Sequence, residues 1–186
     1  ARAILARINP EGYAAEADAV AADEKSVSLR EFLSGRYNRP ILLAVLLAFF
    51  NQMSGINGVI YYAPRIFELA GADQSAALLA TVGVGVVVTV FTAVGMALID
   101  RFGRRTLVLI GSVGYIVSLA MISRGFYFED FALVPHFIFA FIAAHAVGQG
   151  AVIWVYIAEI FPNAARSLGQ TVGSGTHWVM AALLTF

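Results

Sequence analysis

The sequence contains no cysteine and few charged residues. Without cysteine, this stretch of chain forms neither a disulfide framework nor a thiolate metal site. Charged residues make up 13% of the 186 residues, whereas a typical soluble domain carries about 25%. The formal net charge is zero, and lysine and arginine form no long run. The composition therefore gives no indication of a nucleic-acid partner.

The scarcity of charge leaves long apolar stretches. Residues 41–64, 74–99 and 106–123 contain no charged side chain, and 60% of the whole chain is hydrophobic. A bilayer core of roughly 30 Å is crossed by about 20 apolar residues in a helix. Soluble helices of that length have a polar face, which these stretches lack. The sequence therefore predicts an all-α integral membrane protein in contact with the lipid bilayer.

Two regions and five membrane spans are expected. Residues 1–38 are polar and predict a cytoplasmic helical linker, in which Ser28 followed by Glu31 is the pattern of a helix N-cap. Residues 39–186 predict a transmembrane bundle. Its spans are expected at about 39–67, 76–99, 106–124, 134–161 and 167–186. Because the last span reaches Phe186 in mid-membrane, we expect the chain to be a fragment of a longer protein.

Lysine and arginine are divided unevenly between the two sides of the predicted bundle. Ten of the 12 precede the first span or lie in the loops between spans two and three and between spans four and five. Only Arg65 and Arg124 fall on the other side. Since cytoplasmic loops carry the excess of basic residues, the N-terminal segment is predicted to be cytoplasmic. We expect a multi-pass protein of the plasma (inner) membrane.

The first predicted span carries an unusual density of polar groups, and Gly55 and Gly58 lie among them. Glycine permits local unwinding of a membrane helix, which re-aims neighbouring side chains. Amides both donate and accept hydrogen bonds, so the cluster suits a neutral polyhydroxyl ligand. The alternative is that these groups only join helices by hydrogen bonds. The cluster comprises Asn51, Gln52, Ser54, Asn57, Tyr61 and Tyr62.

Polar and aromatic residues also stand inside the fourth and fifth spans. Trp154 and Trp178 are expected inside their spans, away from the membrane interface that tryptophan usually occupies. One interpretation is that an indole stacks on the apolar face of a sugar ring. The alternative is that the two side chains only pack between helices. His145 and His177 have no carboxylate or second histidine at metal-ligand spacing. For both we expect a buried neutral imidazole held by a backbone partner.

Charged motifs mark the two loops predicted to be cytoplasmic. Residues 100–105 read Asp-Arg-Phe-Gly-Arg-Arg, and Glu159 and Arg166 flank Pro162, which ends a helix. Opposite charges at neighbouring helix ends can pair in one conformation and separate in another. The alternative is that these charges are solvated anchors of the topology.

Three motifs, taken together, resemble the sugar porter family of the major facilitator superfamily. Residues 51–57, followed by Tyr61 and Tyr62, are similar to the family's QQxSGIN…YY signature. Residues 100–105 are similar to its D-R-x-G-R-R loop. Trp154 with residues 159–166 is similar to its W…E-[IL]-F-P…R segment.

The resemblance implies a transporter of two six-helix bundles that works by alternating access. This chain would supply five helices of the C-terminal bundle, and its partner would be the N-terminal six-helix half. The substrate-binding residues would be Gln52, Asn51, Asn57, Tyr61, Tyr62, Gln149, Trp154, His177 and Trp178. The gating network would comprise Asp100, Arg101, Arg104, Arg105, Glu159 and Arg166.

Three positions depart from the pattern of the family. Val88 stands where well-known members offer an asparagine to the sugar. The stretch 148–154 lacks the family's proline, which leaves Gln149 as an extra polar contact. His177 replaces a frequent asparagine. These departures leave the identity of the sugar open.

The predicted function is transmembrane transport of a monosaccharide, either as a proton symporter or as a facilitator. Transport of a polyol or cyclitol, and sugar sensing without transport, remain as alternatives. The sequence contains no nucleophile–base pair, metal cluster or phosphate-binding loop, so we expect neither an enzyme nor a cofactor.

Overall fold

The computed structural model describes Ala14 and residues 27–186. Most of the predicted linker, residues 1–38, lies outside the described residues. Its last part contains the short helix α3 (Leu29–Phe32). The Ser28 hydroxyl oxygen accepts a hydrogen bond from the backbone N–H of Glu31 at 3.2 Å, so the predicted N-cap is confirmed.

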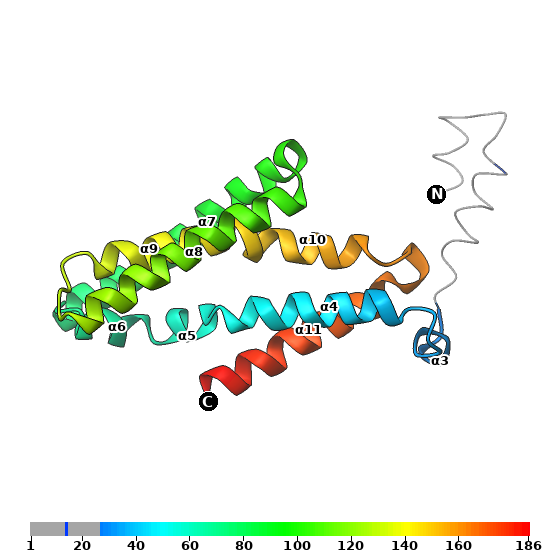
Figure 1. Cartoon of the computed structure of the whole chain (residues 1–186), viewed down its shortest axis with the longest axis horizontal. Coiled ribbons are helices and arrows are strands. Elements are labelled where there is room, and N and C mark those ends of the chain that lie inside the picture. Colours follow the sequence, from blue (N-terminus) through cyan, green and yellow to red (C-terminus); the bar gives the residue numbers. More distant parts are fainter. Residues whose placement is uncertain (1–13, 15–26) are drawn as a thin grey trace.

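The described part of the chain is helical and contains no strand. A first group of helices follows the linker and occupies the lower part of Figure 1: α4 (Asn38–Met53), α5 (Ile56–Tyr61) and α6 (Ala63–Leu69). Two long helices come next, α7 (Gln74–Phe102) and α8 (Arg104–Tyr127). The remaining elements are α9 (Val134–His145), the π-helical turn η1 (Ala146–Gly150), α10 (Ala151–Glu159) and α11 (Asn163–Thr185).

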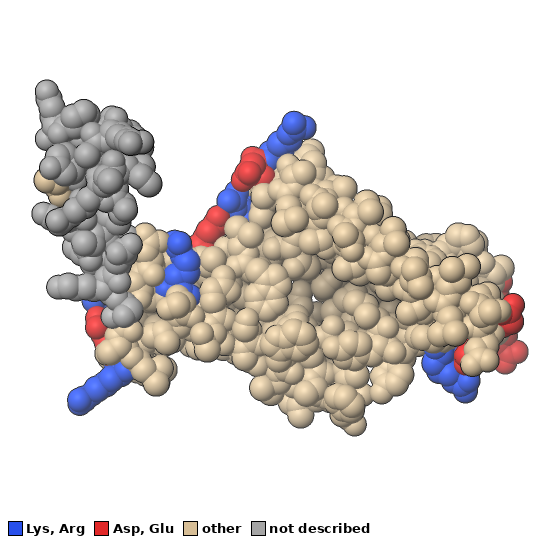
Figure 2. Space-filling model, turned by 180° about the vertical axis from the view of Figure 1, so that it is seen from behind, with Lys and Arg blue, Asp and Glu red and all other residues tan. Residues whose placement is uncertain are grey.

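Four described helical stretches are long and apolar enough to cross a membrane: Asn38–Tyr61, Gln74–Phe102, Arg104–Tyr127 and Val134–Glu159. In α7 and in α8, only 17% of the most apolar 18-residue stretch is buried inside the protein. Apolar side chains therefore face outwards, which is stable in lipid and costly in water. Figure 2 shows the charged side chains of one face near the extremities of the molecule, with a band free of charge between them.

The predicted count of five spans is not settled by these four stretches. α11 covers the predicted fifth span and has 23 residues, which is long enough to cross. It also contains small and polar residues, including Ser167, Gln170 and His177, so it is less apolar than the others. A crossing by α11 stays a prediction.

The predicted first span is broken where the sequence places glycine. α4 ends at Met53, and α5 begins at Ile56 after Gly55, whose φ is 77°. Residues with a side chain rarely adopt this left-handed backbone conformation, whereas glycine adopts it without a steric cost. Gly58 lies inside α5 and does not interrupt it. A second break separates α5 from α6 at Tyr62.

Asp73 begins α7 as its N-cap. Its Oδ1 accepts hydrogen bonds from the Ser75 hydroxyl at 2.6 Å and from the backbone N–H of Ala76 at 2.9 Å. These bonds stabilise the carboxylate and lower the pKa of Asp73 below its usual value. The cap fixes where the long helix α7 starts after the turn that follows α6.

Small residues bring α8 very close to η1. A Cβ at Gly111 would lie 2.7 Å from the Cα of Gly148, and a Cβ at Gly148 would lie 2.7 Å from the Cα of Gly111. Membrane helices gain little from the hydrophobic effect when they associate, so close backbone packing takes its place. This contact fixes the π-helical turn against α8 and thereby positions the residues on both sides of it.

Candidate functional site

A cavity of about 200 Å³ lies where seven helical segments meet, from α4 to α11. Its lining contains no charged side chain; it combines amides, imidazoles, a hydroxyl and an indole with aliphatic groups. The lining residues are Asn51, Ile56, Asn57, Ile60, Val88, Thr92, Ile142, His145, Ala146, Gly150, Trp154 and His177.

Gln52 joins two of the lining residues from behind. Its side chain is 1% exposed, and its Oε1 accepts a hydrogen bond from Asn57 Nδ2 at 3.1 Å. Its Nε2 lies 2.8 and 2.9 Å from the two ring nitrogens of His177. In an unbroken helix, residues five apart point in different directions. The break at Gly55 turns Asn57 back towards Gln52, so the glycine creates the cluster.

Aromatic rings surround His177. Its ring centroid lies 5.0 Å from that of Trp154 and 5.2 Å from that of Trp178, and both pairs meet edge to face. Trp154 lines the cavity, whereas Trp178 is 61% exposed and does not. The backbone oxygen of Trp154 accepts a hydrogen bond from Gln170 Nε2 at 3.0 Å, which ties α10 to α11.

Asn51 and His145 form a second polar group in the lining. Asn51 Nδ2 lies 3.4 Å from His145 Nε2, and the two side chains are 2% and 6% exposed. The sequence predicts a backbone partner for His145 and for His177; the structure instead gives each a side-chain amide from α4, that of Asn51 and that of Gln52. The prediction was wrong because nothing local in the sequence shows that the end of α4 lies beside the end of α9.

Tyr61 and Tyr62 do not line the cavity. Both are about half exposed, and the hydroxyl of Tyr62 donates to the backbone oxygen of Thr185 at 3.0 Å. Tyr62 therefore connects the junction of α5 and α6 to the end of α11.

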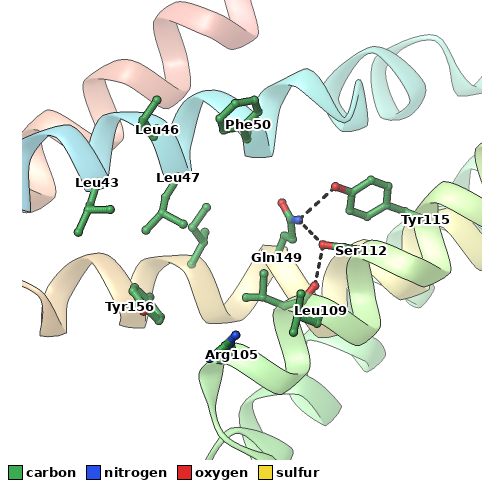
Figure 3. A pocket seen from close by; sticks show the side chains of 12 residues that line it. Leu43, Leu46, Leu47, Phe50, Arg105, Leu109, Ser112, Tyr115, Gln149 and Tyr156 are labelled. Carbon is green, nitrogen blue, oxygen red and sulfur yellow. Dashed lines mark hydrogen bonds between the residues drawn. The ribbon is translucent and has the colours of Figure 1, made fainter.

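Gln149 points into a different cavity, which measures about 470 Å³ and lies between α4, α8 and α10. Its Nε2 donates to Ser112 Oγ at 3.0 Å and to the hydroxyl of Tyr115 at 3.3 Å (Figure 3). The rest of this groove is mainly apolar and includes Leu43, Leu47 and Phe50. No residue lines both cavities, so the structure separates Gln149 from the predicted substrate-binding residues Asn51, Asn57, Trp154 and His177, which line the smaller cavity.

The charged motifs meet at one end of the bundle. Arg104 donates to both carboxylate oxygens of Glu159, with its Nη2 2.7 Å from Oε1, and it lies 3.5 Å from Asp100 Oδ1. Arg166 donates instead to the backbone oxygen of Ala158 at 2.9 Å. The partner of Glu159 is thus Arg104, and Arg166 caps the end of the same helix.

The two remaining arginines of this loop are placed differently. Arg105 lines the groove that contains Gln149, and Arg101 is exposed at the end of α7. Among the described residues, neither forms an ion pair within 4.0 Å. The structure therefore places both near the Arg104–Glu159 pair without joining them to it.

Sequence reasoning named four of the twelve lining residues as substrate-binding residues; among those that it did not name are Thr92, His145 and Gly150. Thr92 follows Val88 by four residues and therefore lies on the same helix face, which was an available signal. Gly150 reaches the cavity through the π-helical turn, which sequence does not reveal. Within the described residues, no three histidine, aspartate or glutamate side chains gather as a metal site.

The cavity combines neutral hydrogen-bond donors and acceptors, apolar helices around them and a broken helix beside them. This combination is typical of membrane transporters that bind a solute within the bilayer. The family model "Sugar (and other) transporter" matches residues 1–186. The chain belongs to this family of sugar transporters.

The similar proteins include symporters and facilitators. The arabinose-proton symporter of Bacillus subtilis is 34% identical over 95% of this chain and 40% of its own length. The D-xylose-proton symporter of Escherichia coli K12 is 37% identical over 75% of this chain and 28% of its own length. The human facilitated glucose transporter member 4 of solute carrier family 2 is 39% identical over 83% of this chain and 31% of its own length.

The solved structures support the same fold. A proton:xylose symporter of the major facilitator superfamily, bound to 6-bromo-6-deoxy-D-glucose, matches with a TM-score of 0.80 and 31% identity. The match covers all of this chain and 40% of that protein. The predicted family and all-α membrane fold are confirmed. The chain therefore spans at most about two fifths of the relatives described here.

Proposed function

We propose that this chain is part of a membrane transporter that moves a monosaccharide by alternating access. The observation that carries the proposal is the uncharged cavity at the broken helix α4–α5, with the linked side chains of Asn57, Gln52 and His177 beside it. The names of the similar proteins, which are symporters and facilitators of sugars, support it.

The chemistry of the cavity fits a neutral polyhydroxyl solute. A charged solute would need an opposite charge in a place where water is scarce, and the lining has none. Amide and imidazole groups match hydroxyls as donors and acceptors. The indole of Trp154 offers an apolar face for the C–H groups of a sugar ring.

The sugar site comprises Asn51, Asn57, Trp154 and His177 in the lining, with Gln52 behind them and Trp178 beside His177. Tyr61 and Tyr62 stand at the edge of this group, where a second half of the transporter would cover them. Gln149 is left out, because its amide is bound in the other groove.

The ion pair of Arg104 with Glu159 is the gate. It joins the start of α8 to the end of α10, and such a bond between helix ends stabilises one conformation over another. Asp100, Arg101, Arg105 and Arg166 surround it with further charge.

The protein is placed in the plasma membrane with the Arg104–Glu159 end in the cytoplasm. Ten of the 12 lysines and arginines support this orientation. α11 is the fifth span, and an N-terminal six-helix half closes the other side of the cavity. The remaining partner is the lipid bilayer.

The test is uptake by the full-length protein in liposomes, with and without an inward proton gradient. The labelled solutes are D-glucose, D-xylose, L-arabinose, D-fructose, D-sorbitol and myo-inositol, and protein-free liposomes are the control. We expect saturable uptake of one or more monosaccharides. Uptake of the polyol or cyclitol alone contradicts the monosaccharide assignment, and sugar binding without uptake of any solute contradicts transport.

The proton gradient distinguishes proton symport from facilitated transport. Accumulation above the external concentration only with the gradient identifies a symporter, whereas equilibration regardless of the gradient identifies a facilitator.

A further inference from the structure

The groove of about 470 Å³ between α4, α8 and α10 lies apart from the proposed sugar site. Its wall is mainly apolar, and Leu43, Leu46 and Phe50 of α4 are between 39% and 61% exposed. On α8 the lining extends from Arg105 to Tyr115, which is about 15 Å along a helix, or roughly three turns. The groove therefore has the length and the character of a seat for another membrane helix.

One polar side chain is aimed into this apolar groove. Gln149 is 8% exposed, and its Nε2 donates to Ser112 and to Tyr115. The Ser112 hydroxyl itself donates to the backbone oxygen of Val108 at 2.7 Å, so towards Gln149 it can only accept. This fixes the orientation of the amide, with its NH₂ group on the side of Ser112.

The amide oxygen of Gln149 is left free. It accepts no hydrogen bond from any of the described residues, and Figure 3 shows it turned away from Ser112 and Tyr115. Within the described part of the chain, Asn51 Oδ1 is the one fully buried side-chain atom without a partner, so the oxygen of Gln149 keeps accessible surface in the groove. An unpaired acceptor is costly inside a membrane, where water does not satisfy it.

Whatever covers the groove must therefore supply a hydrogen-bond donor within the span. The acyl chains of lipids have no donor, whereas a membrane helix can offer the side chain of serine, threonine, asparagine or glutamine. In each half of a major facilitator protein, three helices are followed by three more in inverted orientation. In this chain α4–α6, α7 and α8 form the first set, and α9–α10 and α11 belong to the second. The counterpart of α8 belongs to the part of the relatives that this chain does not span.

The packing of α8 indicates where that counterpart lies. α8 packs closely on α9, the first helix of the second set: a Cβ at Gly114 would lie 2.7 Å from the Cβ of Ala144. Inversion of the repeat places the counterpart of α8 against the first helix of the first set, which is α4. The groove lies on α4, so its position agrees with this expectation.

We propose that a sixth membrane helix of this bundle fills the groove and donates a hydrogen bond from a polar side chain to the amide oxygen of Gln149. The bond anchors the sixth helix to α10 and, through Ser112, to α8. The stretch 148–154 lacks the proline of the family's pattern, so the anchor is a feature of this chain. It concerns the assembly of the bundle and does not depend on which solute is carried.

The first part of the test locates the helix in full-length protein whose other cysteines have been replaced. Leu46→Cys places a thiol in the groove, and single cysteines are introduced in turn along the membrane helix that follows α11. We expect disulfide crosslinks at every third or fourth position, which is the period of one helix face. Ile110→Cys is the matched control, because Ile110 is 56% exposed on α8 but does not line the groove. It should form no such crosslinks.

The second part tests the hydrogen bond by thermal unfolding of the full-length protein. We expect Gln149→Leu to lower the unfolding temperature, and replacement of the facing donor by an apolar residue to lower it as well. Because the two groups form one bond, the double variant should lose clearly less than the sum of the two single losses.

Three results would overturn the inference. If no position of the following helix crosslinks in the Leu46→Cys variant, another molecule such as a lipid occupies the groove. If crosslinks form but no position that faces Gln149 holds a donor, the helix lies in the groove without the bond. Additive losses in the double variant also exclude the bond. The uptake assay tests sugar transport separately, so none of these results bears on the proposed function.

Discussion

At the scale of single residues, the cavity depends on side chains that do not touch it. Gln52 is buried behind the lining, yet it bonds to Asn57 and to His177, which are both in the lining. An amide is suited to this position because one end donates while the other accepts. The orientation of two lining residues from different helices therefore depends on one side chain.

Replacing Gln52 with alanine tests this arrangement. We expect Gln52→Ala to weaken sugar binding by roughly tenfold or more, because Asn57 and His177 lose a buried partner worth about 1–3 kcal/mol. Titration calorimetry on the full-length protein measures the effect. Gln149→Ala is the matched control, since it removes a buried amide from the other groove. An equal loss of affinity in both variants would contradict the role of Gln52.

At the scale of elements, interruptions of helices create the site. The break at Gly55 turns Asn57 towards Gln52, and the π-helical turn η1 separates His145 from Trp154 along the fourth span. Irregular backbone inside a membrane is stable only where protein or a polar cavity satisfies it. Both interruptions adjoin the cavity, which agrees with this requirement.

Two glycines of the same region provide a paired test. Gly55→Ala should destabilise the protein by about 1–2 kcal/mol, because alanine is strained at a left-handed φ; a Cβ there meets no atom within 4 Å, so the cost is conformational. A Cβ at Gly58 also meets no atom within 4 Å, but Gly58 lies inside α5. Gly58→Ala should therefore stabilise the protein by up to about 1 kcal/mol. Thermal unfolding of the full-length protein in detergent measures both. If both variants shift the unfolding temperature in the same direction, the result argues against the break at Gly55.

At the scale of the whole molecule, the charged groups lie near the ends and the neutral site lies between them. Arg104 and Glu159 join the start of α8 to the end of α10, although the two residues are 55 apart in sequence. The pair is partly exposed, with side chains that are 33% and 47% accessible, so water screens the attraction and its contribution is small. A conformational equilibrium between two states of similar energy responds to a bias of that size.

Neutralising Glu159 should shift this equilibrium without changing the sugar contacts. The measurement is the rate at which a thiol reagent, added on the side of the membrane where Arg104 lies, labels a cysteine placed at Thr92. We expect Glu159→Gln to raise this rate by up to about fivefold. Because the chain has no cysteine of its own, this half adds no background. Glu68→Gln is the control, since the Arg65–Glu68 pair lies within one helix. Unchanged labelling in Glu159→Gln would exclude the gate.

The sequence alone determined the class of protein, the helices and much of the chemistry. Successive charge-free stretches of about the length that crosses a bilayer predicted membrane helices, and Gly55 among polar residues marked the break. Motifs around Gln52 and Asp100 indicated the sugar transporter family, which the comparisons confirm.

Only the tertiary structure decided which polar groups meet. Gln149 and Trp154 stand five residues apart on the same span, and only the packing of the neighbouring helices decides that they line two different cavities. Glu159 pairs with Arg104 instead of the nearer Arg166, and His145 meets Asn51, which is 94 residues away. Hydrophobic pattern fixes the axis of a membrane helix, whereas the rotation of each helix about that axis comes from close backbone contacts such as Gly111 with Gly148. Such contacts join distant parts of the chain, and no local pattern encodes them.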